Sequence, residues 1–323
     1  MTKTVAVVLG GSGFIGARLI EHLMAAGEHA VRSLDIQPPR RPVEGVEHHL
    51  VDLRQPIPAE LGQDARIIYN LAAVHRTPGH PDQAYFETNV ASAINAVALA
   101  EACQIKTIVF TSSISVYGPC ETPISEVSPL RPVTAYGASK RLAEDIHRQW
   151  RRQAPDRRLI IARPGVVFGP GEAGNYTQLA KALKGGYFAY PGRRDTVKSG
   201  GSVDELLRTI DFALNRAESD ILYNFAYPDP STTEQIVKIL CRLTGRRANP
   251  ITLPLQPMLL AARVFETATR MGLKTAIHRD RVMKLVQSTK IRPDWLLANG
   301  YRFSSDIQTA LEQWCAETKG RFD

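Results

Sequence analysis

The chain has 323 residues, of which 44% are hydrophobic and 22% are charged, a composition typical of a folded protein with a large core. Its formal net charge is +8, but the basic residues are spread over many segments without an aromatic-interleaved basic motif, so no nucleic-acid partner is expected. The four cysteines are far apart and form no CxxC pair, which argues against a metal site or a disulfide framework and favours a cytoplasmic location. The longest apolar stretch, 251–273, is interrupted by charged residues, so no membrane span is expected.

A short apolar run at 4–9 leads directly into three glycines spaced three apart, Gly10, Gly13 and Gly16. The run is typical of a buried parallel strand, and residues 17–26 continue at helical spacing. Glycine permits unusual dihedral angles and lets the backbone approach a pyrophosphate, while the free N–H groups at a helix start attract its negative charge. The stretch predicts a dinucleotide site, although a glycine pattern by itself also fits a turn that binds nothing.

Strand and helix patterns alternate through the first half of the chain. Strands are predicted at 4–9, 30–35, 48–51, 66–70, 107–112 and 159–162, and helices at 17–26, 85–102 and 135–153. This alternation predicts an α/β fold in which a doubly wound parallel sheet is covered on both faces by right-handed crossover helices.

The pattern changes after residue 165. Loops are predicted at 168–174 and 185–201, helices at 176–183 and 203–217, a strand at 223–226, and mostly helices from 228 onward. We therefore expect a nucleotide-binding domain at 1–165, to which 203–227 returns. A smaller, partly interleaved C-terminal substrate lobe would contain 166–202 and 228–323. Within this lobe, segment 259–281 is interpreted as an amphipathic helix that covers the core rather than one that lies on a membrane.

An acidic residue, Asp35, ends the second predicted strand, nineteen residues after Gly16 (35 minus 16). A carboxylate at about this distance from the glycines can accept hydrogen bonds from the adenosine ribose, which favours NAD over NADP. Arg40 and Arg41 follow closely and could instead bind a 2′-phosphate, and Asp35 could be an ordinary turn residue at the end of a strand.

Tyr136 and Lys140 are four residues apart in a predicted helix, so the phenol and the ammonium lie on the same face. A phenol has a pKa near 10 and is a poor base at neutral pH. A neighbouring ammonium and a positive nicotinamide ring favour the phenolate, which can then accept a proton. Alone, such a pair is more often an exposed surface pair; its position after the fifth strand of a dinucleotide-binding pattern favours catalysis.

Hydroxyl side chains stand at the end of that fifth strand, where ligands bind in parallel α/β sheets. Ser112 and Ser113 occupy this position. A serine there can bond both a substrate oxygen and the Tyr136 phenol, but serines also cap strand ends. We assign the catalytic role to Ser113 and the capping role to Ser112.

These residues together resemble the extended short-chain dehydrogenase/reductase family, in particular its NAD-dependent nucleotide-sugar epimerase/dehydratase branch. The matching pieces arrive in family order: the glycine turn, Asp35, Asp52-Leu53, Asn70 to Ala73, Asn89, Ser113, Tyr136 with Lys140, and Arg163-Pro164. Segment 290–301 also resembles the family's C-terminal end. The resemblance implies a Rossmann-type fold, NAD as the cofactor, a nucleotide-diphosphate sugar as the substrate, and a homodimer formed by the helices at 85–102 and 135–153.

The resemblance also implies roles for single residues. Besides Gly10, Gly13, Gly16 and Asp35, cofactor contacts are implied for Phe14, Ile15, Asp52, Leu53, Leu71, Ala72, Ala73, Asn89, Tyr136, Lys140 and Pro164. Asp52 and Leu53 would lie near the adenine, and Asn89 would support the active-site backbone. Tyr136 would be the acid/base, and Lys140 would bind the nicotinamide ribose and lower the pKa of Tyr136.

Departures from the family pattern disfavour two of the family's reactions, dehydration and decarboxylation. The family's sugar dehydratases carry an Asp-Glu pair directly after the strand-five hydroxyl residue, because elimination of water needs an extra acid and base. This chain has Ile114 and Ser115 there, which cannot do that work, and it also lacks the glutamate of the decarboxylases. Hydride transfer alone remains: epimerisation, or oxidation or reduction at one carbon.

The residues expected to bind the substrate match the family pattern less closely than those expected to bind the cofactor. Val166 stands where the family often has an asparagine that contacts the nucleotide diphosphate. Asn175 could substitute by capping a helix that faces the phosphate. Lys198 occupies the position of a family arginine and could neutralise a phosphate without bidentate geometry. Further candidates for substrate binding are Arg193, Arg279 and His75; the alternative is a surface charge for each arginine and a polar loop residue for His75.

The leading hypothesis is an NAD-dependent nucleotide-sugar 4-epimerase, for a UDP-hexose or UDP-N-acetylhexosamine, that supplies polysaccharide biosynthesis. The first alternative is an NAD(P)H-dependent 4-keto-sugar reductase, and the second is a hydroxysteroid-type dehydrogenase. A non-catalytic dinucleotide sensor is disfavoured because a sensor has no need of Ser113, Tyr136 and Lys140 together.

Overall fold

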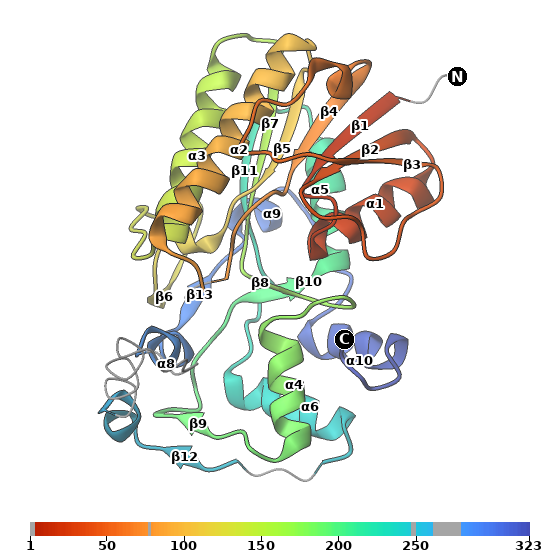
Figure 1. Ribbon diagram of the computed structural model, residues 1–323. Helices are drawn as coiled ribbons and strands as arrows, with labels where there is room; N and C mark the ends of the chain where they lie inside the picture. The colour runs from red at the N-terminus through yellow and green to blue at the C-terminus, as the bar shows by residue number, and fades with distance from the viewer. Residues whose placement is uncertain (1–3, 77–78, 247–249, 261–278) are drawn as a thin grey trace.

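The computed structural model describes residues 4–76, 79–246, 250–260 and 279–323. Its centre is a seven-stranded sheet in the order β11-β7-β5-β4-β1-β2-β3, in which every neighbouring pair is parallel (Figure 1). The strands are β1 (Thr4–Leu9), β2 (His29–Asp35), β3 (Val46–Leu50), β4 (Ala65–Asn70), β5 (Thr107–Thr111), β7 (Arg158–Pro164) and β11 (Asp220–Phe225). The predicted Rossmann-type, doubly wound fold is confirmed.

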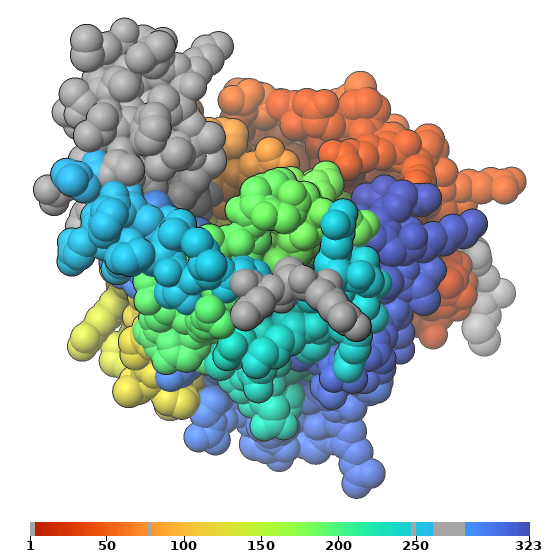
Figure 2. Space-filling model, turned by 90° about the horizontal axis from the view of Figure 1, so that it is seen from below, coloured from red at the N-terminus to blue at the C-terminus, as the bar shows by residue number. Residues whose placement is uncertain are grey.

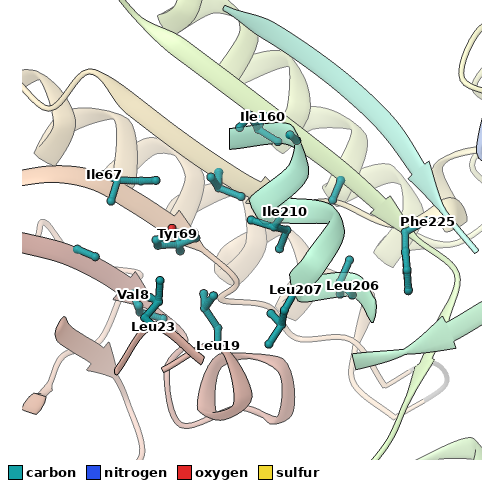
Figure 3. Packing of buried hydrophobic residues seen from close by; sticks show 14 of the residues in the cluster. Val8, Leu19, Leu23, Ile67, Tyr69, Ile160, Leu206, Leu207, Ile210 and Phe225 are labelled. Atoms are coloured by element: carbon teal, nitrogen blue, oxygen red, sulfur yellow. The ribbon is translucent and has the colours of Figure 1, made fainter. Parts of the chain in front are cut away.

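Helices cover both faces of this sheet because its central strands are apolar on both sides. On one face, α1 (Phe14–Ala26) and α5 (Val203–Leu214) pack their leucines and isoleucines against the strands. Figure 3 shows Leu19 and Leu23 of α1 and Ile210 of α5 in one cluster with Val8 and Tyr69 of the sheet. On the other face, α2 (Asp82–Ala102) and α3 (Ala135–Arg152) bury a second cluster.

A smaller lobe lies below the carboxyl ends of the strands (Figure 1). Its helices α4 (Asn175–Gly185), α6 (Thr233–Leu243) and α10 (Ile307–Glu317) share a third hydrophobic cluster. Figure 2 looks onto this lobe and shows these segments, distant in sequence, gathered on one face. Further helical elements are α8 (Arg279–Val286), α9 (Asp294–Ala298) and the short turns η1 (Ala59–Gly62) and η2 (Ile114–Val116).

Three short parallel pairs were not predicted: β6 (Cys120–Ile124) with β13 (Thr289–Ile291), β8 (Val166–Phe168) with β10 (Gly200–Ser202), and β9 (Tyr190–Pro191) with β12 (Thr252–Leu253). Strands β9 and β10 occupy part of the loop expected at 185–201. Strands of two to five residues are too short to show a period, so only pairing in space defines them.

Two expectations concern the late, apolar part of the chain. Most of the helix expected at 259–281 lies outside the described residues. Among the residues that are described, no helix is long and apolar enough to cross a membrane.

Candidate active site

The glycine turn between β1 and α1 is shaped by close backbone approach. Gly10 has a φ of +83°, and a Cβ there would lie 2.7 Å from the Ala72 nitrogen. A Cβ on Gly16 would lie 2.2 Å from the Gly10 carbonyl oxygen. Gly13 caps α1 without a side-chain hydrogen bond, so the first N–H groups of the helix, at Phe14 and Ile15, remain available to an anion. The turn therefore fits a dinucleotide diphosphate.

Asp35 lies at the end of β2, beside this turn. Its carboxylate accepts hydrogen bonds from the backbone nitrogens of Ser12 (3.0 Å) and Gln37 (2.9 Å), which hold it in place. A cavity of about 170 Å³ lies next to it, lined by Ser12, Ser33, Asp35, Gln37, Pro38, Pro39, His48, His49 and Leu50. A carboxylate held at the edge of a cavity has the position expected for a ribose-binding residue.

The other predicted cofactor residues lie along the same edge of the sheet. Leu71 continues β4, its nitrogen donating to the Leu9 carbonyl at 2.9 Å, and Ala72 lies against Gly10. Asp52 pairs with Arg54, whose guanidinium lowers the pKa of this carboxyl. Buried Leu53 and Pro164, together with Ala73, complete this group, and their contacts with a cofactor stay predictions.

Tyr136 is the second residue of α3, whose N-terminus is capped by the Thr134 hydroxyl. The Tyr136 phenol is hydrogen bonded to the Ser113 hydroxyl, which follows β5. Ser113 also accepts a hydrogen bond from the Ser115 nitrogen at 3.1 Å. The structure thus brings together the two hydroxyl groups that the sequence placed 23 residues apart (136 minus 113).

Lys140 lies one helical turn further on, and its side chain is buried. Its ammonium donates to the Thr111 carbonyl at 2.8 Å and lies 4.8 Å from the centre of the Phe110 ring. Burial lowers the pKa of Lys140 to about 7, although the carboxylate of Glu144 opposes the shift. This lysine is therefore poised between its two protonation states near neutral pH.

The pKa of Tyr136 differs from the expectation. Burial raises it above 10, and the hydrogen bond to Ser113 opposes this rise. Lys140 is not among the groups that lower it, and its ammonium is directed to the Thr111 carbonyl. A positive nicotinamide ring, the second influence expected on the phenol, comes only with the cofactor.

Asn89 links the loop after β4 to the catalytic helix. Its amide oxygen accepts from the Val74 nitrogen at 2.8 Å, and its amide nitrogen donates to the Ser139 hydroxyl at 2.9 Å. Ser139 in turn donates to the Tyr136 carbonyl at 2.9 Å. These bonds give Asn89 the means to support the backbone around Tyr136, as the sequence resemblance implied.

His75 is one of the predicted substrate residues and lies in the loop after β4. Its pKa is lowered chiefly by burial, and also by the positive charges of Arg76 and Lys140. A neutral imidazole can donate or accept a hydrogen bond, so His75 stays a candidate for substrate binding.

The remaining predicted substrate residues have other partners. Lys198 donates to the carbonyls of Lys284 and Gln287, both at 2.5 Å, and so stabilises the end of α8. Arg193 pairs with Asp195 and Glu121. These bonds occupy the cations that were expected to face a phosphate, and their contact with substrate stays a prediction.

Asn175 does not have its expected capping role. Gly174 is the N-cap of α4, and Asn175 is the first residue inside the helix and is exposed. The buried Glu172 carboxylate accepts from the Thr177 nitrogen at 2.9 Å, so a side chain of the preceding loop already fills this helix start. Arg279 begins α8, and its side chain is outside the described part.

The positions that carry an acid and a base in the dehydratases hold Ile114, which is buried, and Ser115 in η2. Neither can exchange a proton at neutral pH. In the described ranges, no group of three or more His, Cys, Asp or Glu could hold a metal ion. The titratable or hydroxyl side chains that meet here are Ser113, Tyr136 and Lys140.

Two buried charged residues beside the site were given no role by the sequence analysis, Glu144 and Arg163, which form an ion pair of 2.6 Å. Glu144 follows Lys140 by four residues, as Lys140 follows Tyr136. This helical spacing was the available signal, because it places all three side chains on one face of α3.

Replacing Lys140 with Met should change how stability depends on pH. Between pH 7 and 10.5 the folded protein has released a proton from Lys140 that the unfolded chain still binds. The contribution of Lys140 to the unfolding free energy therefore rises with pH across this window, and its burial cost is fully present below it. The unfolding free energy, measured by chemical denaturation at pH 7 and at pH 10.5, should therefore rise less for Lys140→Met than for the wild-type protein. Equal slopes would contradict the assignment, and exposed Lys106→Met serves as the control.

The family model described as the NAD dependent epimerase/dehydratase family matches residues 6–226. The N-acetyl-alpha-D-glucosaminyl-diphospho-ditrans,octacis-undecaprenol 4-epimerase of Escherichia coli O157:H7 is 30% identical over 311 residues, which cover 95% of this chain and 93% of that protein. The UDP-glucose 4-epimerase of Thermotoga maritima, solved with UDP-glucose, has a TM-score of 0.78 at 17% identity and covers 99% of this chain and 100% of its own. The UDP-glucose 4-epimerase of Thermus thermophilus, solved with NAD, has a TM-score of 0.76 at 21% identity and covers 98% of this chain and 99% of its own.

The solved structures share the fold, while the family model and the Escherichia coli relative cover enough of the chain to show its family. The chain belongs to the NAD dependent epimerase/dehydratase family and is an NAD-dependent enzyme of the extended short-chain dehydrogenase/reductase type.

Proposed function

We propose that the protein is a 4-epimerase of a sugar carried on a diphosphate, of the UDP-hexose or UDP-N-acetylhexosamine type, and that it acts through a transient 4-keto sugar. The observation that carries the proposal is the Tyr136–Ser113 hydrogen bond beside buried Lys140, with no carboxylate at Ile114 or Ser115. Such a site can move one proton at a hydroxyl group but has no second acid to expel water.

The residues would divide the work as follows. Bound NAD supplies the hydride acceptor and donor at the 4-carbon of the sugar. The Tyr136 phenol holds and returns the proton of the 4-hydroxyl group, and Ser113 orients that oxygen through its own hydroxyl. Lys140 supplies a positive charge one helical turn away, which favours the phenolate form once the ammonium is free of the Thr111 carbonyl.

A second candidate concerns the carrier of the sugar. The name of the Escherichia coli relative places its sugar on undecaprenyl diphosphate, and that of the Thermotoga relative places it on UDP. In this chain Val166, partly buried at the start of β8, stands where the family often has the asparagine that contacts a nucleotide diphosphate. This substitution favours a polyprenyl-diphosphate sugar, with the same chemistry at the 4-carbon.

The organisation of the chain supports this proposal. Residues 1–165 with 203–227 would bind NAD, and 166–202 with 228–323 would bind the substrate; the pairing of β11 with β7 in the main sheet supports this division.

We also propose a cytoplasmic homodimer. Free cysteines support the compartment, and exposed Ile94 on α2 and Leu142 on α3 support a helical interface, which sedimentation velocity would test.

The decisive assay uses purified protein without added cofactor. UDP-glucose, UDP-N-acetylglucosamine and undecaprenyl-diphospho-N-acetylglucosamine are incubated separately, and the 4-epimers are separated by chromatography. Interconversion of any of them supports a 4-epimerase that retains NAD, and the preferred substrate identifies the carrier. Turnover that begins only when NAD(P)H and a 4-keto sugar are supplied would instead support the reductase.

A further inference from the structure

A buried network of charged and polar groups lies directly behind the catalytic helix. Glu144 is fully buried and Arg163 is 2% exposed. Arg163 donates to both carboxylate oxygens of Glu144, from Nε at 2.8 Å and from Nη2 at 2.6 Å. The Ser112 hydroxyl donates to the same carboxylate at 2.6 Å. The carboxylate therefore joins α3, the end of β5 and β7 at one point.

The network continues from Arg163 toward the C-terminal segment. Arg163 Nη1 donates to the Tyr117 hydroxyl at 2.6 Å, and Tyr117 donates to the Asn224 amide oxygen at 2.8 Å. Asn224, on β11, donates to the Arg292 carbonyl at 3.1 Å. The polar groups of the network thus find partners, which is the condition under which a buried ion pair is tolerated.

Stability is a weak reason for such a pair. Two charges lose their hydration on burial, and an apolar pair of similar volume is often as stable or more stable. The position of this pair suggests another use. Tyr136, Lys140 and Glu144 follow one another at four-residue intervals on one face of α3, so the carboxylate lies one turn from the catalytic lysine.

Glu144 carries the negative charge that balances the ammonium of Lys140. The Glu144 carboxylate raises the pKa of Lys140 against the effect of burial. His147, the next buried group of α3, has a pKa lowered to about 4 and is neutral at working pH, while the positive charge of Lys140 acts on His75 across the site. On its outer side Glu144 also meets Arg148 at 3.2 Å.

We infer that Glu144 is a positioning residue for the proposed reaction: through Ser112 it holds the end of β5, next to Ser113, and through its charge it favours the protonated form of Lys140 beside Tyr136. Arg163 holds the carboxylate in the orientation that serves both purposes. The inference rests on the proposed role of Tyr136 as the acid/base. It adds to that role a charged residue that touches neither substrate nor cofactor.

The test compares Glu144→Gln with the double variant Glu144→Gln/Arg163→Met. The single variant keeps the shape of the side chain, loses the charge and leaves Arg163 unpaired. The double variant removes both charges and should recover most of the lost stability, because no buried charge is left without a partner. In both variants we expect kcat at neutral pH to fall about tenfold and its half-maximal pH to rise by about one unit, since one pKa unit corresponds to a factor of ten.

A second readout does not depend on turnover. The absorbance of the Tyr136 phenolate, taken with NAD bound as the difference between each protein and its Tyr136→Phe version, should titrate at higher pH when Glu144 is replaced. The control is Glu205→Gln on α5, another fully buried carboxylate, which bonds to Tyr301 and Ser304 in the other core. The Glu205→Gln variant should lose stability, while the pH midpoints of kcat and of the phenolate titration should stay unchanged.

Recovery of kcat together with stability in the double variant, with unchanged pH midpoints, would show a purely structural ion pair and overturn the inference. If no sugar is turned over by the wild-type protein, the proposed function fails while the phenolate titration still decides the role of Glu144. If the single variant does not fold, the double variant supplies the same comparison.

Discussion

Tyr136→Phe is expected to lower kcat by about three orders of magnitude while leaving NAD affinity within a few-fold of wild type. The variant removes one hydroxyl, and with it the group that exchanges the proton of the sugar; acid–base catalysis of this kind contributes about 10²–10⁴-fold. The ring remains in place because it packs edge-on against Tyr85, with 6.2 Å between ring centres. Initial rates under saturating substrate and calorimetric titration with NAD measure the two effects separately.

Tyr85→Phe is the matched control for this variant. Tyr85 is a buried tyrosine next to Tyr136, but its hydroxyl donates to the Arg76 carbonyl instead of the site. Its loss should reduce stability slightly and leave kcat close to wild type. A Tyr136→Phe protein with wild-type turnover would remove Tyr136 from the acid/base role.

Gly16→Ala is expected to destabilise the protein by about 1–3 kcal/mol, the usual cost of overpacking a tight site. A Cβ at this position would lie 2.2 Å from the Gly10 carbonyl oxygen and 2.8 Å from the Gly11 Cα, and backbone atoms cannot move aside without distorting the turn. A hydrogen bond to a charged group contributes about 1.5–3 kcal/mol, so displacing one N–H of the turn should weaken NAD binding at least about tenfold. Thermal unfolding and NAD titration measure both changes.

Gly27→Ala, at the other end of the same helix, separates these effects. Gly27 has a φ of +71°, so alanine there is strained, but nothing lies within 4 Å of its Cβ position. The control should lose about 1 kcal/mol and bind NAD normally. Normal NAD binding by Gly16→Ala would show that the turn does not hold the diphosphate.

Residues that act through local chain geometry were found from the sequence. The three glycines, Asp35 after the second strand, and Tyr136 with Lys140 at helical spacing all depend on near neighbours in the chain, and the structure places each on the expected element. Largely apolar runs of four to six residues likewise predicted the strands of the main sheet, because burial on both faces leaves a continuous signal. The family and its cofactor followed from these motifs taken together.

Contacts between distant segments could not be read in this way. Lys198 was a candidate for a phosphate, which stays a prediction; its contacts with the last turn of α8, 86 and 89 residues further along the chain, could not be predicted. Asn175 was expected to cap α4, but the preceding loop brings Glu172 to that position. A cation or a cap in a sequence shows only what a side chain can do, and the packing of other segments decides which partner it meets.

The local chemistry of the cofactor turn and the Tyr136–Lys140 helix follows from the sequence alone, because each motif is complete within a few residues. The environment that sets the charge of Lys140 arises only in the folded protein. Glu144 and Arg163 are 19 residues apart and lie on a helix and a strand that pack together, and their carboxylate–guanidinium contact also reaches Ser112 on a third element. Burial makes these charges act strongly on their neighbours, and burial is a property of tertiary packing.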